Sequence, residues 1–566
     1  MSERGPNAPP PGPQTGSGRS DGDLGKLDQR NGRAAESAAA TPPVAALGDQ
    51  LSPSADAPIP LVEISTGSIQ GLPDETLGDQ PSPPLTVTLG TARVTLQQVA
   101  AVAAGAPVSI DADASALLAR SHAVVEAALA AATPVYGLNT ELGAGRDTPV
   151  DPSDLAAFQR RIIANHCGGI GPALPTDEVR TLAFVRLAGF TRGGSGVRPA
   201  LADAWAALLN AQIVPLVPAR GSVGAADLTH LAAVAAVLTG TGHVVMAGEV
   251  VPGRQALKAA HLEPFDLAPG EALACLSSNA YSVGVGALEL ARLDRLSNAA
   301  DRVVALSLEA IARRGDGGNL SPFDEAVARA TGRRGQADAA ASVLENLAGS
   351  ITQDSRSVQD PLSFRTVPQL HGAQRDQLRA AGAEVETELN ARSDNPLVDV
   401  ETNRIISGGN FQVLSLAVQF DTLRAVLAHV ASASERRISA LSELARPDRS
   451  AGTSLIPGLL WYSAAANLAE IRQLAAPASV AGAALSGVED QATYAPLALQ
   501  LLQRSRALTL EIFAIEALHA AHLQGPEGRV VTGLETALRA LSAQNLPSAA
   551  LVYHTVQLLE DAEPAR

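Results

Sequence analysis

Aromatic residues and cysteines are scarce in this sequence. The 566 residues include 2 Trp, 5 Tyr, 9 Phe and 2 Cys, whereas Ala, Leu and Val are abundant. This composition suits helices packed through small aliphatic side chains better than aromatic-rich β-sandwiches. Two cysteines, Cys167 and Cys275, cannot form a disulfide framework and make no C-x-x-C pair for zinc or redox chemistry. We therefore expect a mainly α protein of the reducing cytoplasm.

Positive charge is also in short supply. Lys and Arg number 42 against 58 Asp and Glu, which gives a net charge of −16 at pH 7. Proteins that bind nucleic acids or anionic membranes need basic surfaces, so we expect neither as a partner. We also expect no secretory signal and no membrane span. The least charged stretch, 228–248, is interrupted by Thr, Gly and His, whereas a span needs about 20 predominantly apolar residues.

Residues 1–84 contain no aromatic residue and are rich in Pro, Gly and Ser. Such a segment cannot bury enough apolar surface to offset the entropy lost on ordering. We predict a disordered leader, and its composition leaves open whether it serves docking or regulation. From residue 85 the pattern becomes globular, with a β-prone alternation at 85–89 and a helical pattern through 94–102.

Long proline-free segments predict long helices. They are 271–321, 412–446 and 497–525, the last one closed by Gly525-Pro526. In 412–446 the apolar residues recur mostly every two to four positions, as on helical faces. Helices of this length with apolar residues on more than one face indicate a bundle, which we expect to be shared between subunits.

Two motifs could indicate phosphate or metal binding, but each has a simpler structural explanation. The Gly-rich stretch 192–199 lacks the G-x-x-x-x-G-K-[ST] pattern of a phosphate-binding loop, so we favour a tight turn between helices. Asp227 and His230 lie three residues apart and share a helical face, but no further metal ligand stands near them. A satisfied polar contact explains the pair, and we expect no metal site.

A series of short polar strings beside glycines is more informative, because loops of this kind often carry functional sites. In chain order they are Tyr136-Gly137-Leu138-Asn139-Thr140, Asn165-His166-Cys167, Gly221-Ser222-Val223-Gly224-Ala225-Ala226-Asp227-Leu228, Gln359-Asp360-Pro361-Leu362-Ser363-Phe364-Arg365, Asp394-Asn395-Pro396-Leu397, Ser407-Gly408-Gly409-Asn410-Phe411 and Glu489-Asp490-Gln491. In order and spacing the series resembles the histidine and aromatic amino-acid ammonia-lyase family. The family motifs include Y-G-x-N-T-G-F-G, G-S-V-G-A-S-G-D-L, Q-D-x-Y-S-x-R and S-G-G-N-F, and the resemblance covers roughly residues 85–523.

The resemblance implies an ammonia-lyase-like, mostly helical fold. It implies a smaller N-terminal active-site domain, which we place at 85–290, and a central and C-terminal helical bundle at 291–566. It also implies a homotetramer in which each active site is assembled from three subunits. The substrate would be an amino acid or a related small carboxylate.

The family's prosthetic group, methylidene imidazolone, forms from an Ala-Ser-Gly run, and that run is missing here. The corresponding stretch is one residue shorter, with Ala225, Ala226 and Asp227 at the degenerate position. No serine is present there to lose water, and Ser222 cannot substitute because the β-branched Val223 would crowd ring closure. We expect the group to be absent and no other cofactor to be bound.

The resemblance also assigns roles, and it shows further departures. Tyr136 matches the general base, with Glu141 as a new carboxylate beside it, and Arg365 matches the clamp for the substrate carboxylate. Leu362 replaces a catalytic tyrosine. The remaining matched positions would bind substrate: Asn139, His166, Ser277 in place of an asparagine, Gln359, Asn410, Phe411 and Glu489.

Three functional hypotheses remain open from the sequence. The first is a lyase that performs elimination, or the reverse addition, without the electrophile. The second is a catalytically silent homologue that acts as a binding or regulatory subunit, in a hetero-oligomer with an active lyase. The third is an ordinary histidine or aromatic amino-acid ammonia-lyase.

Overall fold

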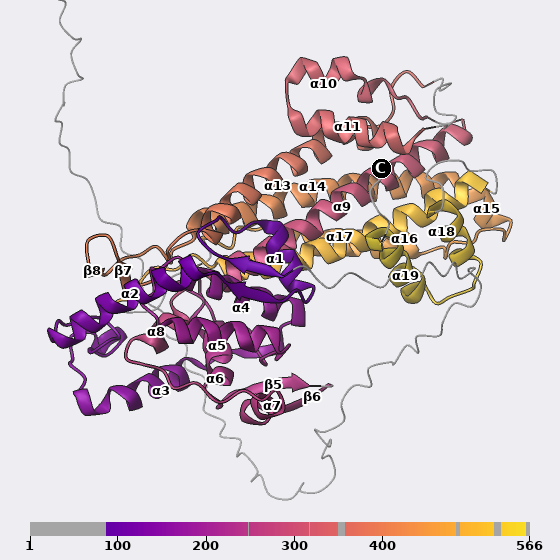
Figure 1. Cartoon of the computed structure of the whole chain (residues 1–566). Coiled ribbons are helices and arrows are strands. Elements are labelled where there is room, and N and C mark those ends of the chain that lie inside the picture. Colours follow the sequence, from indigo (N-terminus) through magenta and orange to yellow (C-terminus); the bar gives the residue numbers. More distant parts are fainter. Residues whose placement is uncertain are drawn as a thin grey trace, which may run out of the picture. The chain divides into compact units, whose positions relative to one another are not determined.

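The computed structural model describes residues 86–246, 248–315, 317–348, 357–480, 482, 487–525 and 534–561. The predicted disordered leader, 1–84, lies outside these residues. The described part is mostly helical, which confirms the mainly α prediction, and its short strands pair two by two (β1–β2, β3–β4, β5–β6 and β7–β8). Figure 1 shows a group of shorter helices and strands at one end of a set of long helices.

The elements up to residue 276 make up the part with short helices. They are β1 (Val87–Leu89), α1 (Leu96–Ala103), β2 (Val108–Ile110), α2 (Ala112–Ala130), the 3-10 helices η1 (Gly143–Gly145) and η2 (Pro152–Asp154), α3 (Leu155–His166), β3 (Ile170–Ala173), α4 (Thr176–Thr191), α5 (Pro199–Asn210), β4 (Pro218–Arg220), α6 (Leu228–Leu238), β5 (His243–Met246), β6 (Glu249–Pro252), α7 (Gly253–Ala259) and α8 (Glu271–Leu276). The Gly-rich stretch 192–199 joins α4 to α5, as predicted.

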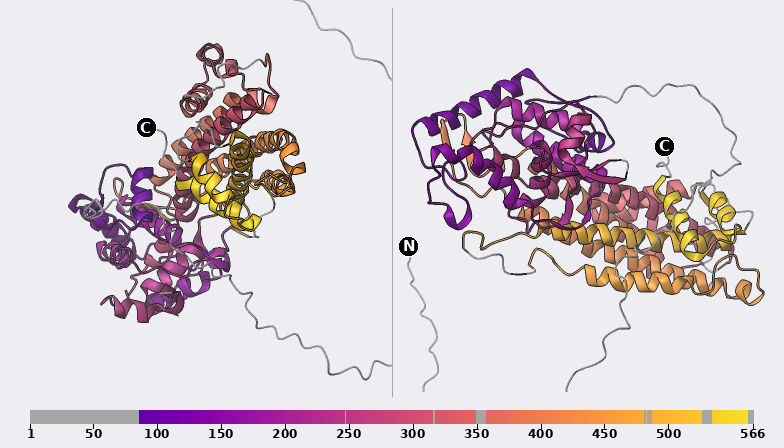
Figure 2. Two further views of the ribbon diagram at one scale, coloured as in Figure 1. Left: turned by 90° about the vertical axis from the view of Figure 1, so that its right-hand side faces the viewer. Right: turned by 90° about the horizontal axis from the view of Figure 1, so that it is seen from below.

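The elements that follow include the long helices. They are α9 (Ala280–Arg313), η3 (Ser321–Phe323), α10 (Glu325–Thr331), α11 (Arg334–Asn346), α12 (Leu362–Arg365), α13 (Val367–Leu389), β7 (Leu397–Asp399), β8 (Arg404–Ile406), α14 (Leu414–Leu444), α15 (Arg446–Ser450), α16 (Leu460–Leu474), α17 (Ala495–Gln524), α18 (Leu534–Ser542) and α19 (Ser548–Asp561). Helix α17 packs against α9, α14 and α16, while α13 packs against α9, α11 and α14. Figure 2 shows these helices running alongside one another as a bundle.

The predicted long helices are found with one exception. Helix α14 matches 412–446, and α17 matches 497–525 and ends at Gly525, whose φ is 71°. The segment 271–321 is instead broken at 277–279 between α8 and α9, so the prediction was wrong as one helix. The break occurs because Ser277 and Ser278 bond to groups distant in sequence: Ser277 Oγ accepts from Asn395 N at 3.0 Å, and Ser278 O accepts from Asp227 N at 2.7 Å. The predicted domain boundary at 290 falls inside α9 and remains a prediction.

Helix α14 is long and apolar enough to cross a membrane by length and composition. However, half of its most apolar window is buried inside the protein, where it packs against α13, α16 and α17. A core helix of a bundle passes the same test, so this helix gives no support for a membrane span. The predicted absence of a membrane partner and the cytoplasmic location remain predictions.

A fully buried charge cluster ties three bundle helices together. Glu516 of α17 accepts hydrogen bonds from Arg437 of α14, through Nε at 2.6 Å and Nη2 at 2.9 Å. Ser307 of α9 and Ser434 of α14 donate to the same carboxylate at 2.6 and 2.5 Å. The remaining guanidinium nitrogen, Arg437 Nη1, donates to Ser363 O in α12 at 2.8 Å. Because every polar atom of the pair has a partner, the cluster connects α12 to the centre of the bundle.

Glu516→Ala should lower the free energy of unfolding by about 3–5 kcal/mol, because it leaves the Arg437 charge buried without its partner. Equilibrium urea denaturation measures the loss. The control is Glu470→Ala, which removes the half-exposed pair with Arg504 on the bundle surface and should change stability little. Equal losses in the two variants would contradict a central role for the buried cluster.

Candidate active site

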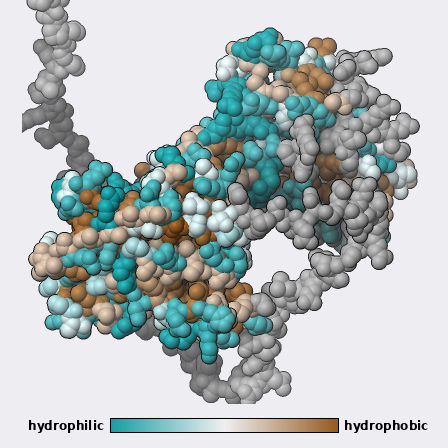
Figure 3. Space-filling model, viewed as in Figure 1, coloured by the Kyte–Doolittle hydropathy of each residue, from teal (hydrophilic) through white to brown (hydrophobic). Residues whose placement is uncertain are grey.

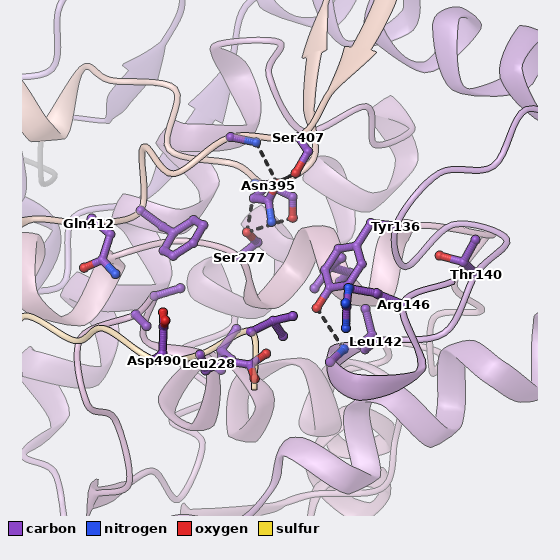
Figure 4. Close-up of a pocket in the computed structure, with 18 of the residues that line it drawn as sticks. Tyr136, Thr140, Leu142, Arg146, Leu228, Ser277, Asn395, Ser407, Gln412 and Asp490 are labelled. Carbon is purple, nitrogen blue, oxygen red and sulfur yellow. Dashed lines mark hydrogen bonds between the residues drawn. The ribbon is translucent and has the colours of Figure 1, made fainter. Parts of the chain in front are cut away.

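A pocket of about 820 Å³ lies where the loops of the N-terminal part meet the ends of the long helices (Figure 4). Of the predicted site residues, Tyr136, His166, Ala225, Ala226, Ser277, Phe411 and Glu489 line it. Asn139, Glu141, Asp227, Gln359, Arg365 and Asn410 are not among its lining residues. One chain therefore brings together about half of the predicted site.

The loop that carries Tyr136 is held by its own backbone and by one amide side chain. Asn139 Oδ1 accepts from Val135 N at 2.8 Å, and Asn139 Nδ2 donates to Thr133 O at 2.8 Å. Gly137 has a φ of 68°, and a Cβ atom there would lie 2.3 Å from the side chain of Leu273. Asn139 thus shapes the turn rather than facing the pocket, and glycine is needed where the loop passes Leu273.

The Tyr136 hydroxyl accepts a hydrogen bond from Gly143 N at 3.1 Å (Figure 4). Burial raises the pKa of the Tyr136 phenol, and the charge of Glu489 raises it further. The Gly143 hydrogen bond and the charge of Arg146 lower this pKa, but the net direction is upward. Glu141, predicted beside this base, is exposed, and its carboxylate lies over Gly145 instead of in the pocket.

Ala225 and Ala226 form part of the pocket wall, in a turn that closes tightly on itself. Gly224 and Ala226 are bridge partners across the turn, with φ values of 83° and 60°. Thr493 Oγ1 donates to Gly224 O at 2.9 Å, and Tyr494 N donates to Val223 O at 2.9 Å. The segment before α17 therefore holds the turn in place from behind.

Asp227 lies behind this wall and is fully buried. Its carboxylate accepts from Ser222 Oγ at 2.9 Å and from Ser282 N at 2.9 Å. Burial is the main influence on Asp227 and raises its pKa. His230 stacks on Tyr281 with ring centroids 4.2 Å apart. The described residues contain no group of three or more His, Cys, Asp or Glu side chains that could hold a metal ion.

His166 and Glu489 both line the pocket. His166 ends α3, and its Nδ1 lies 2.7 Å from Ile162 O. In the neutral ring Nδ1 therefore carries the proton and Nε2 is an acceptor. The charged groups along the lining are three carboxylates, Asp147, Glu489 and Asp490, and one arginine, Arg146. The described lining is thus negative overall, which favours a ligand with a cationic group.

Arg365 and Gln359 lie at the other end of the bundle. When the side-chain amide of Gln359 is oriented so that its oxygen faces the guanidinium of Arg365, Gln359 Oε1 accepts from Arg365 Nη2 at 3.0 Å. Arg437 bonds to Ser363, two residues before Arg365. Since α14 starts beside the pocket, the stretch from Leu414 to Arg437 separates the two sites by about 35 Å at about 1.5 Å per residue.

Asn410 is likewise outside the lining, although its neighbour Phe411 is part of it. Asn410 is exposed and donates through Nδ2 to Arg392 O at 3.2 Å. Lining residues that were not predicted as site residues include Arg146, Asn395, Ser407, Gln412 and Asp490. Asn395, Ser407 and Asp490 belong to the polar strings of the sequence, so membership of these strings could have indicated that they line the pocket. Arg146 follows a Gly-Ala-Gly run outside these strings, and no feature of the sequence indicated its place at the pocket.

The sequence profile of the family described as "Aromatic amino acid lyase" matches residues 94–540. The histidine ammonia-lyase of Paracidovorax citrulli (strain AAC00-1) is 38% identical over 458 residues, which cover 78% of this chain and 88% of that protein. The chain therefore belongs to the aromatic amino acid lyase family, whose members act on amino acids and normally use an electrophile formed from the protein itself.

Solved structures agree with this assignment. Ergothionase from Treponema denticola, an ergothioneine degrading enzyme in complex with desmethyl-ergothioneine sulfonic acid, is similar with a TM-score of 0.78 at 26% identity, over 84% of this chain and 99% of that chain. Histidine ammonia-lyase from Trypanosoma cruzi is similar with a TM-score of 0.74 at 25% identity, over 84% of this chain and 93% of that one.

Gly137→Ala should destabilise the protein by roughly 2–3 kcal/mol, because the new methyl group adds a clash with Leu273 to the strain of a positive φ. The matched control is Gly332→Ala, where φ is 63° and nothing lies within 4 Å of the new Cβ. That variant should lose only about 1 kcal/mol. Thermal and urea unfolding compare the two, and equal losses would show that the loop is not packed against Leu273.

Proposed function

We propose that this protein catalyses elimination from an amino-acid-derived carboxylate, or the reverse addition, without methylidene imidazolone. The observation that carries the proposal is Ala226 in the pocket wall, where the family's chemistry requires a serine hydroxyl that leaves as water. The backbone adds support, because Asp227 N donates to Ser278 O at 2.7 Å and is not available to attack the Ala225 carbonyl. Residues 225–227 do not fit the prosthetic group.

The absence of an electrophile sets a condition on the leaving group. In the family the electrophile attaches to the substrate and makes ammonia leave. Without it the substrate must already carry a good leaving group, and a quaternary ammonium meets this condition because it departs as a neutral tertiary amine. The negative lining, with Glu489 and Asp490, suits such a cation. Ergothioneine, which the similar T. denticola enzyme degrades, is a trimethylammonium betaine of this kind.

In the proposed step Tyr136 acts as the general base. Its phenolate takes a proton from the carbon β to the carboxylate, and the C–H electron pair forms the carbon–carbon double bond. The carbon–nitrogen bond breaks, and its electron pair leaves with the tertiary amine. The product is an α,β-unsaturated carboxylate, so the atoms and charges balance without a further reactant.

The carboxylate clamp, in this proposal, comes from another subunit. Arg365 and Gln359 are about 35 Å from the pocket of their own chain, a distance that a rigid helix does not close. A homotetramer with shared sites would bring the two ends together. Large apolar side chains are exposed on α12 and α14, at Leu362, Leu414 and Val418. On the face shown in Figure 3, such apolar groups are scattered among hydrophilic residues.

A second candidate is ordinary histidine ammonia-lyase activity. It is favoured by the 38% identity to a histidine ammonia-lyase and by His166 and Glu489, which line the pocket at positions that face the side chain in histidine-type members. The chemistry of residues 225–227 weighs against it. The two candidates differ in the covalent state of the protein and in the substrate.

Intact-mass spectrometry tests the covalent state. The purified protein should have the mass of its sequence, without the loss of two water molecules that formation of the prosthetic group requires. An active ammonia-lyase prepared in the same way provides the positive control. A deficit of two waters in this protein would overturn the proposal, and turnover of L-histidine alongside it would establish the second candidate.

Turnover of betaines tests the substrate class and the base. Trimethylammonium betaines of histidine and its thiol derivative should yield conjugated acids, detected by ultraviolet absorbance, whereas the parent amines should not. Tyr136→Phe should reduce kcat/KM by at least about 100-fold, because general-base catalysis contributes 100-fold or more. Tyr553→Phe, on the exposed face of α19, should match the wild type. Unchanged turnover in the Tyr136 variant would remove this residue from the mechanism.

A further inference from the structure

The segment that follows Tyr136 folds back along it in a compact turn. Glu141 N donates to Thr148 O at 2.9 Å, and Thr148 N donates to Gly145 O at 2.8 Å. Val150 N then donates to Asn139 O at 2.9 Å, which anchors the turn to the tyrosine loop. These backbone bonds hold Arg146 at the pocket lining, near the Tyr136 ring (Figure 4).

We propose that Arg146 is a positioning residue for the base: its guanidinium stabilises the phenolate of Tyr136 and keeps it able to accept a proton. This inference rests on the proposed function, in which Tyr136 takes the substrate proton. It goes beyond that function because it assigns a role to a residue that neither the sequence motifs nor the family resemblance singled out.

The charges around Tyr136 explain why a cation is needed there. Asp147, Glu489 and Asp490 line the same pocket, and their negative charges oppose the formation of a phenolate at Tyr136. Glu141 is turned away over Gly145. His166 also lines the pocket, with its Nδ1 2.7 Å from Ile162 O. Among the described lining residues, Arg146 is the one with a permanent positive charge. Without it, the phenolate would face carboxylates with only the Gly143 N–H in support.

Arg146 is available for this role because its other interaction is weak. Its Nε lies 3.7 Å from the Asp147 carboxylate, which is almost fully exposed, and half of the Arg146 side chain is exposed as well. A surface pair of this kind contributes little energy and does not neutralise the guanidinium. The pKa of Tyr136 agrees in direction: burial raises it most, and Arg146 opposes that effect.

The direct test is titration of Tyr136 in the intact protein by near-ultraviolet difference absorbance. Subtracting the Tyr136→Phe spectrum at each pH isolates this tyrosine from the others. Arg146→Met should move its ionisation to higher pH, and Arg146→Lys should keep most of the wild-type behaviour. Glu489→Gln should move the ionisation in the opposite direction. Arg333→Met, which removes an exposed arginine at the start of α11, is the matched control and should leave it unchanged.

The pH profile of betaine turnover gives a second readout. In Arg146→Met the acid limb of kcat/KM should shift to higher pH, with a loss of roughly three- to tenfold on that limb. The loss should disappear at alkaline pH, where the phenol ionises without help. A merely structural role would lower kcat/KM equally at every pH, and that result would overturn the inference.

The two proposals fail in different ways. If the Tyr136 titration of Arg146→Met superimposes on that of the wild type, the inference about Arg146 is wrong, whatever the activity. If the titration shifts as expected but the wild-type protein eliminates no amine from any betaine, the inference about Arg146 stands and the proposed function is wrong. Far-ultraviolet circular dichroism confirms that each variant is folded.

Discussion

The length of the bundle helices is the constraint on which the rest of the structure depends. Helices α13 and α14 are packed against each other and run between the pocket end and the α12 end. A helix cannot bend by tens of ångströms, so residues at its two ends stay apart within one chain. The pocket loops gather at one end, while Arg365 stays at the other. Within one chain the pocket and Arg365 are therefore kept apart, and their separation is built into the core packing.

The turn at 221–228 is held by a framework of hydrogen bonds that does not involve the side chains of Ala225 and Ala226. Asp227 remains fully bonded to Ser222 and Ser282, and Thr493 still closes the turn from behind. These contacts belong to the scaffold, since they join α6, α9 and the segment before α17. The pocket retains its walls, its tyrosine loop and its charged groups, while the missing serine and glycine change what the wall can do.

The sequence predicted the features that depend on local pattern. The apolar periodicity of α14 and α17 and the turn at 192–199 are properties of neighbouring residues, and they were found as expected. The break between α8 and α9 was missed because Ser277 bonds to Asn395, a residue distant in sequence. Arg146 was missed for a similar reason, since only the folded loop brings it to the pocket. The position of Arg365 relative to the pocket depends on the length of α14, which a short sequence motif does not indicate.

The bond between Tyr494 and Val223 links the segment before α17 to the turn that forms part of the pocket wall. Tyr494 is the residue before α17, the helix that packs on α9, α14 and α16, and its N–H holds the turn of the pocket wall. A small axial shift of α17 would therefore move the wall by a similar amount. A load on the bundle that displaces α17 would in this way reshape the pocket through the backbone alone.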